Sequence, residues 1–258
     1  MRSAITVCAA LALCGVAGAT SAASSSGDIP ENIKAAVANP ARPERDRQRD
    51  VNRRPEQVLA FAGVRSGLRI AELEPASGYF TRILCKAVGS SGHIYAINFT
   101  LHFSPEQMKR MAGRNMGPPP APQTDCDNIT YSVQASTALN LPSDLDMVWT
   151  AENYHDFRIP EFGSADVRTF NQTVFNALKP GGVFIVEDHA AAAGSGARDT
   201  ATLHRIDPAL VKQELESAGF KYVGQSQILH NPNDAHTDMV FKTVDRTDRF
   251  LFKFRKPE

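Results

Sequence analysis

The chain has 258 residues, of which 42% are hydrophobic, and its 28 Lys and Arg residues balance its 28 Asp and Glu residues. A chain of this size and composition can bury one sizeable core, and nothing in it demands a second domain. Because neither sign of charge is in excess, no long-range field attracts nucleic acid, and we expect no nucleic-acid partner.

The chain begins with the pattern of a secretory signal peptide. Arg2 precedes an apolar run over residues 5–16, and small residues follow that run. Cleavage after Ala19 or Ala22 fits these small residues, and the apolar run is too short to span a bilayer. We therefore assign residues 1–22 to a signal peptide and predict an exported, periplasmic protein with no transmembrane segment after cleavage.

Cleavage would leave Cys85 and Cys126 in the mature chain. An oxidising compartment permits one disulfide between them. It does not require one, because small unpaired cysteines are also common in protein interiors, and both alternatives stay open.

One domain is expected after the signal peptide. Residues 23–39 are predicted to be a flexible lead-in, because they begin with small polar side chains that cannot bury enough surface to become ordered. Residues 40–258 are assigned to the domain. Its first stretch, 40–55, is dense in charges of both signs, which predicts a solvated helix or arm rather than a segment that faces a ligand.

From residue 55 the hydrophobic pattern becomes regular. Apolar side chains at helical spacing predict a helix over 55–62, and the apolar-rich run 68–73 predicts a buried strand. A turn over 74–78 leads into a helix over 79–88 and a strand over 93–97. Strand, turn, helix and strand in this order form a right-handed βαβ unit.

The remaining elements repeat this alternation. Further helices are predicted over 104–113, 164–178 and 207–218, with Ser164 and Asp207 as N-caps, and further strands over 129–133, 145–150, 183–187, 220–229 and 250–254. This order predicts a Rossmann-like, doubly wound α/β sheet of about seven strands, with an antiparallel pair formed by the last two. The ligand crevice of such a sheet lies beyond the carboxyl ends of its strands, which draws attention to the turn at 72–79.

Two segments carry a family resemblance. The run from Ile70 to Thr81, with Gly78 in its turn, resembles the first motif of class I S-adenosylmethionine-dependent methyltransferases, and Lys179-Pro180-Gly181-Gly182 before an apolar strand is typical of the same fold. Over residues 40–258 the chain more closely resembles a group of exported bacterial proteins predicted to be methyltransferases. The stretches that carry this resemblance are Asn153-Tyr154-His155-Asp156, Glu187-Asp188-His189, His204-Arg205-Ile206-Asp207 and Phe252 to Pro257.

The resemblance implies that S-adenosylmethionine binds across the first turn. The residues it assigns to the cofactor are Glu72, Glu74, Pro75, Ala76, Ser77, Gly78 and Tyr79, with Asn98 near the ribose and Gln134 and Ala135 near the adenine. The chain departs from the family pattern at three of these positions. Glu74 and Ala76 stand where the motif has glycine, and Asn98 is neutral where the family offers a carboxylate to the ribose hydroxyls.

The same resemblance implies a small-molecule methyl acceptor near the loops that follow the fourth and fifth strands. The catalytic candidates are Asn153, His155, Asp156, Glu187 and His189. His155 could take a proton from the acceptor, and methyl transfer otherwise needs mainly in-line positioning. His204 and Asp207 are interpreted as a network at a helix start.

Two alternatives remain at the level of the sequence. A methyltransferase-fold binding protein without methyl-transfer activity would explain the lost glycines, and it would suit a compartment in which the methyl donor is not made. A metal-dependent enzyme using Glu187, His189 and His155 is the other alternative, but their spacing is not a recognised metal signature, and we expect no metal ion. The oligomeric state and the acceptor are not determined by the sequence.

Overall fold

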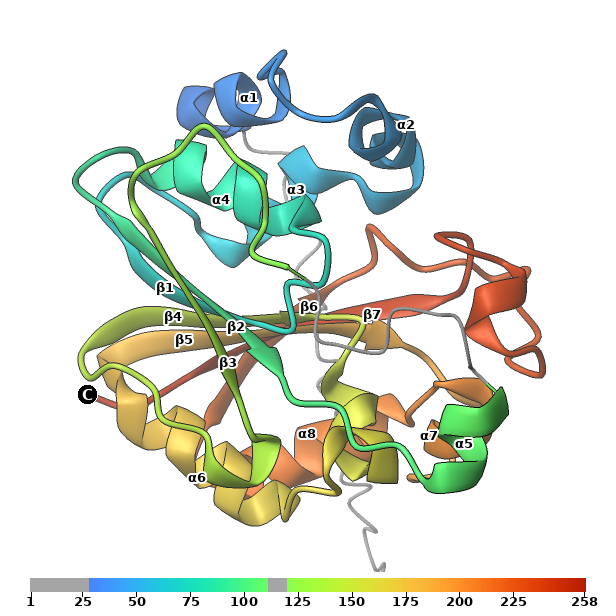
Figure 1. Ribbon diagram of the computed structural model, residues 1–258. Helices are drawn as coiled ribbons and strands as arrows, with labels where there is room; N and C mark the ends of the chain where they lie inside the picture. The colour runs from blue at the N-terminus through green and yellow to red at the C-terminus, as the bar shows by residue number, and fades with distance from the viewer. Residues whose placement is uncertain (1–27, 111–119) are drawn as a thin grey trace, which may run out of the picture.

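The computed structural model describes residues 28–110 and 120–258. The predicted signal peptide, the first part of the predicted lead-in and the end of the helix predicted over 104–113 therefore lie outside the described residues. The domain is built on one seven-stranded sheet of order β3-β2-β1-β4-β5-β7-β6 (Figure 1). The strands are β1 (Arg69–Leu73), β2 (His93–Phe99), β3 (Ile129–Gln134), β4 (Leu145–Ala151), β5 (Leu178–His189), β6 (Lys221–Ser226) and β7 (Arg249–Arg255). Strands β1 to β5 pair in parallel, while β7 is antiparallel to both β5 and β6, which confirms the predicted fold.

Helices cover both faces of this sheet (Figure 1). They are α1 (Glu31–Val37), α2 (Glu44–Arg53), α3 (Pro55–Ala62), α4 (Tyr79–Val88), α5 (Pro105–Arg110), α6 (Val167–Ala177), α7 (Thr200–Leu203) and α8 (Pro208–Ser217). Helices α1, α3 and α4 bury their apolar sides in one core cluster, and α6 and α8 bury theirs in a second cluster on the other face. Because the central strands are buried on both faces of the sheet, their sequences are apolar runs without alternating polar residues.

The N-caps of two helices were predicted with different success. Asp207 caps α8 as expected, because its side chain accepts a hydrogen bond from the N–H of Ala209, and Pro208 occupies the first turn. Ser164 does not cap α6. Its φ of 46° is left-handed, whereas a capping residue is extended, and Asp166 takes the role by accepting a hydrogen bond from the N–H of Arg168 at 3.2 Å.

The segment before residue 55 is more ordered and more buried than the sequence predicts. Residues 31–37, placed in the flexible lead-in, form α1, and its Ile33 and Ala36 pack against α4. In the charged stretch, Arg42, Asp46 and Arg53 are almost completely buried, so the prediction of a solvated segment is wrong for these three residues. Glu44, Arg45 and Arg47 are exposed. The charges tolerate burial because they have partners; the guanidinium of Arg82 donates to Asp46 through Nε at 2.7 Å, for example.

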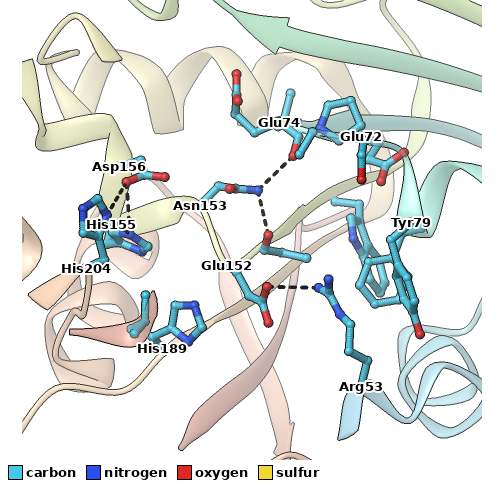
Figure 2. A pocket seen from close by; sticks show the side chains of 18 of the residues that line it. Arg53, Glu72, Glu74, Tyr79, Glu152, Asn153, His155, Asp156, His189 and His204 are labelled. Carbon is cyan, nitrogen blue, oxygen red and sulfur yellow. Dashed lines mark hydrogen bonds and ion pairs between the residues drawn. The ribbon is translucent and has the colours of Figure 1, made fainter. Parts of the chain in front are cut away.

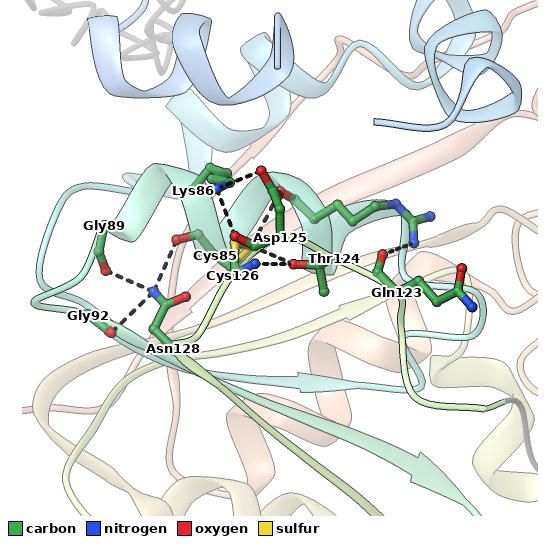
Figure 3. The surroundings of a disulfide bond; sticks show 10 residues. Cys85, Lys86, Gly89, Gly92, Gln123, Thr124, Asp125, Cys126 and Asn128 are labelled. Carbon is green, nitrogen blue, oxygen red and sulfur yellow. Dashed lines mark hydrogen bonds and ion pairs between the residues drawn. A yellow bond between two sulfur atoms is a disulfide. The ribbon is translucent and has the colours of Figure 1, made fainter. Parts of the chain in front are cut away.

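A disulfide joins α4 to the loop that precedes β3. It links Cys85 to Cys126, which decides the alternative that the sequence left open (Figure 3). The same loop is held by a 2.9 Å ion pair between Lys86 and Asp125 and by a hydrogen bond from Asn128 to the Gly89 carbonyl. The loop is therefore fixed to the helix whose first turn faces the predicted ligand crevice.

Among the described residues, no helix combines the length and the apolar character that crossing a bilayer would require.

Candidate functional site

A pocket of about 380 Å³ opens at the carboxyl ends of β1, β4 and β5, where the order of the chain in the sheet reverses. Of the predicted site residues, it is lined by Glu72, Glu74, Pro75, Ala76, Ser77 and Tyr79 from the first turn and by Asn153, His155, Asp156 and His189 from the loops after β4 and β5 (Figure 2). Gly78, Asn98, Gln134, Ala135 and Glu187 do not line it. The sequence thus locates the pocket and both of its principal walls.

The first turn has an unusual backbone. Glu74 and Ala76 adopt positive φ angles of 53° and 48°, which side chains other than glycine disfavour. Gly78 has a φ of 85°, and a Cβ atom at that position would lie 2.4 Å from the Cβ of Pro122. The space beside Gly78 is therefore filled by the disulfide-bonded loop, and this glycine serves the packing of the turn.

Three buried polar atoms at the pocket lack hydrogen-bond partners among the described residues. They are Oε2 of Glu72 near the end of β1, Nε1 of the neighbouring Trp149 in β4, and Nε of Arg53 at the end of α2. Burial raises the pKa of Glu72 to about 7. Because an unsatisfied buried polar atom is costly, these groups leave hydrogen-bonding capacity in the pocket for a polar ligand or for water.

The side chains of Asn98 and Glu74 meet at the end of β2. Asn98 is completely buried, and its Oδ1 accepts a hydrogen bond from the N–H of Ala76 at 3.2 Å. This bond holds the first turn against the end of β2. The carboxyl of Glu74 reaches the same strand end and accepts a hydrogen bond from the N–H of Phe99. Burial raises the pKa of Glu74 to about 8. A carboxyl group is thus present at the end of β2, although it comes from the turn and not from the strand.

Gln134 is the last residue of β3 and Ala135 follows it, and neither residue lines the main pocket. The side-chain Oε1 of Gln134 accepts a hydrogen bond from the N–H of Asn140 at 2.8 Å, and Gln134 lines a separate, shallower pocket. Ala135 precedes a short 3₁₀ helix over Ser136–Ala138. In this structure neither side chain reaches the residues of the first turn.

A buried network of charges forms the floor of the pocket, and the sequence did not reveal it. Arg249 in β7 donates to Glu152 at 2.7 Å and to Glu187 at 2.9 Å, while Arg53 at the end of α2 lies 3.4 Å from Glu152. Burial raises the pKa of Glu187 to about 7. Glu187, predicted to be catalytic, is therefore a buried partner of Arg249, whereas Arg53 and Glu152 line the pocket.

Asn153 connects the two walls of the pocket. Its side-chain amide donates to the carbonyl of Glu74 at 3.0 Å and to the carbonyl of Ala151 (Figure 2). Asn153 therefore holds the loop after β4 against the first turn.

His155 lies in the 3₁₀ helix Tyr154–Arg158, between two carboxylates. Its Nδ1 is 2.8 Å from Asp188 and its Nε2 is 3.0 Å from Asp156. Burial opposes the charged form, but the two carboxylates outweigh it and raise the pKa of His155 to about 10. To take a proton from a methyl acceptor, the imidazole of His155 must first lose the proton that these two carboxylates stabilise.

His189 ends β5 on the same side of the pocket, and its Nδ1 lies 2.7 Å from the hydroxyl of Thr247. Burial lowers the pKa of His189 to about 4, so its ring is neutral at neutral pH.

His204 lines the pocket, whereas the sequence predicted it to belong to a network at a helix start. It follows α7 with a left-handed φ of 56°, and its Nδ1 lies 3.2 Å from Nε2 of His155 (Figure 2). The motif His204-Arg205-Ile206-Asp207 marked the segment, but only the adjacency of the loops after β4 and β5 places His204 beside His155.

Comparison with known proteins supports the fold. No protein-family model and no curated protein matches the sequence. Among solved structures, the chain is similar to a SAM-dependent methyltransferase from Aquifex aeolicus, with 16% identity, a TM-score of 0.51 and coverage of 78% of this chain and 89% of that one. It is also similar to a chain in the complex between the Haloferax volcanii Trm112 methyltransferase activator and a proposed methyltransferase, with 18% identity, a TM-score of 0.54 and coverage of 88% and 98%. The fold is thus that of SAM-dependent methyltransferases.

Proposed function

We propose that this protein is an S-adenosylmethionine-dependent methyltransferase that acts on a small molecule and works outside the cytoplasm. The observation that carries the proposal is the unpaired carboxylate oxygen of Glu72, which lines the pocket beside the turn at 74–78. The pocket lies where open α/β sheets bind ligands, at the reversal of strand order.

The residues present fit the amino-acid end of the methyl donor. Its ammonium group would complete the hydrogen bonding of Glu72 and favour the ionised carboxylate. Its carboxylate would be attracted by Arg53, a buried pocket residue whose Nε has no hydrogen-bond partner among the described residues. A group with one positive and one negative end thus matches the unbonded atoms of Glu72 and Arg53, and Arg53 keeps its ion pair with Glu152 at 3.4 Å.

The residues also suggest how the ribose is held. Asn98 is occupied with the Ala76 amide, but Glu74 brings a carboxyl group to the end of β2. We assign to Glu74 the hydrogen bond to the ribose hydroxyls that a β2 carboxylate would otherwise accept. Glu74 would thus supply the carboxylate that is absent at position 98.

The donor supplies an activated methyl group, and the protein orients the acceptor. The imidazoles of His155 and His189 lie across the pocket from Glu72 and Tyr79 (Figure 2). An acceptor hydroxyl, amine or thiol beside them would be aligned with the donor, and alignment supplies most of what methyl transfer needs.

A binding protein without methyl-transfer activity is the second candidate. It is favoured by Glu74 and Ala76, whose side chains line the pocket in a turn with left-handed backbone angles. Such a protein would bind the donor or a related nucleoside but release no demethylated product. A radiolabelled methyl-transfer assay over a panel of small hydroxyl, amine and thiol compounds separates the two candidates.

Export is supported by two independent features of the chain. The N-terminal sequence has the pattern of a secretory signal peptide, and the mature part carries the Cys85–Cys126 disulfide, a bond that persists in oxidising compartments. The resemblance to exported bacterial proteins agrees with both features.

Calorimetric titration with S-adenosylmethionine and with its demethylated product tests the proposed cofactor. We expect heat of binding for both ligands and an affinity at least about tenfold lower in the Glu72→Gln variant, because a charge-assisted hydrogen bond contributes about 1.5–3 kcal/mol. Glu216→Gln, an exposed change on α8, is the matched control. Absence of heat with the wild-type protein would remove the cofactor from the proposal.

A further inference from the structure

Three ligating atoms converge at one wall of the pocket. They are Nε2 of His155, Oδ1 of Asp156 and Nδ1 of His204 (Figure 2). The His155–Asp156 distance is 3.0 Å, and the distances from His204 to Asp156 and to His155 are both 3.2 Å. The three atoms therefore form a nearly equilateral triangle.

Hydrogen bonds alone do not satisfy this triangle. Three bonds around a ring of three atoms require each atom to donate once, and an ionised carboxylate oxygen donates none. If both histidines donate to Asp156, their two N–H groups face each other across 3.2 Å. If the Nε2–H of His155 donates to His204 instead, no proton lies between Nε2 of His155 and Oδ1 of Asp156, although these atoms are only 3.0 Å apart.

A metal ion satisfies all three sides at once. Donors about 2.0–2.1 Å from a tetrahedral zinc ion are about 3.3 Å apart, and donors at right angles around an octahedral ion are about 3.0 Å apart. The observed distances of 3.0 and 3.2 Å lie in this interval. An ion placed slightly above the plane of the triangle would thus lie at coordination distance from all three atoms.

The surroundings of His155 match those of a metal ligand. Its other nitrogen, Nδ1, is 2.8 Å from Asp188, and its backbone N–H donates to the second oxygen of the same carboxylate at 2.7 Å. A carboxylate in this position fixes the orientation of a metal-binding imidazole and increases its basicity.

We propose that His155, Asp156 and His204 bind one divalent transition-metal ion such as Zn²⁺, with a free coordination position toward the pocket. All three residues line the pocket, so the side of the ion away from them faces it. Three protein ligands and one open position are typical of catalytic rather than structural zinc sites. The open position would accept a lone pair from a hydroxyl, thiol or water in the pocket.

The metal site differs from the expectation drawn from the sequence, in which Glu187, His189 and His155 were the candidate ligands and no metal was expected. Glu187 is engaged by Arg249, and His204 supplies the third ligand. The site does not depend on methyl transfer, because its geometry involves no residue of the first turn.

Zinc titration of the mature protein tests the proposal. The protein is produced without a polyhistidine tag, stripped of metal with a chelator, and titrated with Zn²⁺ against a chromophoric competitor. We expect one equivalent to bind, with affinity at least about 100-fold weaker in His204→Ala, since loss of a residue that only orients a ligand already costs about 10–100-fold. Mg²⁺ should bind much more weakly, because imidazole ligands suit zinc and not magnesium.

His93→Ala is the matched control, because His93 lies at the opposite, amino end of β2 and pairs with Thr130. Zinc affinity that is unchanged in His93→Ala and lost in His204→Ala supports the site. Failure of the wild-type protein to bind one equivalent, or equal affinity in wild type and His204→Ala, overturns it.

Circular dichroism verifies that each variant is folded. If His204→Ala does not fold, the zinc affinity of the near-isosteric Asp156→Asn variant is compared with that of the wild-type protein in its place. Titration of the metal-free protein with S-adenosylmethionine separates this result from the proposed cofactor. Either binding event can fail while the other remains.

Discussion

Two carboxyl groups, a buried one at Glu72 and a half-buried one at Glu74, give the pocket its character at the scale of single residues. Glu72 and Glu74 both project into it from the first turn region, and burial raises the pKa of each, to about 7 and about 8. Neither is therefore fully ionised at neutral pH in the free protein. A cationic ligand would favour their charged forms, so that ligand binding and deprotonation are linked.

The carboxyl of Glu74 should make the stability of the protein depend on pH. Its pKa is about 8 in the folded chain against an ordinary value of 4.5, so between these values the folded state binds more protons than the unfolded state. The free energy of unfolding then falls as the pH rises from about 4.5 to about 8. In Glu74→Gln this decrease should be smaller by more than about 1 kcal/mol, as measured by urea unfolding across the range.

The hydrogen bond to the N–H of Phe99 survives in this variant, because the amide oxygen of glutamine also accepts. Glu216→Gln changes an exposed carboxyl and should keep the wild-type profile. Parallel profiles for Glu74→Gln and the wild-type protein would show that Glu74 titrates normally.

At the scale of elements, helix α2 is attached to the sheet domain by buried charges. Asp46 accepts hydrogen bonds from Arg82 of α4, and both side chains are almost completely buried. Arg49, one turn further along α2, pairs with Asp245 at 2.6 Å. These pairs position the end of α2, where Arg53 enters the pocket.

Removing Asp46 should destabilise the fold strongly. Asp46→Ala leaves the guanidinium of Arg82 buried without its carboxylate, and breaking a buried pair in this way costs about 3–5 kcal/mol. Glu44→Ala, in the same helix, breaks an exposed pair with Arg47 and should cost less than about 1 kcal/mol. Similar free energies of unfolding for the two variants would contradict the role assigned to Asp46.

The disulfide should stabilise the connection between α4 and the loop before β3. It closes a loop of 41 residues in sequence, and removing such a bond costs about 2–4 kcal/mol. The double variant Cys85→Ser with Cys126→Ser should lose this amount in urea unfolding, and reductant should bring the wild-type protein to the same value. A wild-type midpoint that is insensitive to complete reduction would show that the bond contributes no stability.

The whole molecule was largely predictable in its architecture. The buried strands appear in the sequence as short apolar runs between turn residues, and α3, α4, α6 and α8 appear as segments with apolar residues at helical spacing, because local patterns reflect burial on one or two faces. Helix α1 was missed because Ile33 and Ala36 are too few to form a pattern, and their burial depends on α4.

The site was predictable only where its residues follow one another in the chain. The first turn and the segment Asn153 to Asp156 were found, since each follows a predicted strand. Arg53 and His204 were not, because α2 and the segment after α7 reach the pocket through tertiary packing. Sheet order, not sequence spacing, brings His204 to His155.

The proposed export is tested with all 258 residues of the sequence. Expressed in a bacterium from its own first residue, the protein should appear in the periplasmic fraction with its N-terminus at residue 20 or 23, as cleavage after Ala19 or Ala22 requires. Mass spectrometry of the purified protein measures the cleavage site. An intact chain beginning at Met1 in the cytoplasm would contradict the proposed location.

We propose that the pocket between the first turn and the loops after β4 and β5 holds the methyl donor. A crystal structure of the mature protein grown with the demethylated donor would locate the ligand. We expect its ammonium group at Glu72, its carboxylate at Arg53 and its ribose at Glu74. A ligand bound elsewhere on the protein, or a pocket that stays free of ligand at saturating concentration, would contradict it.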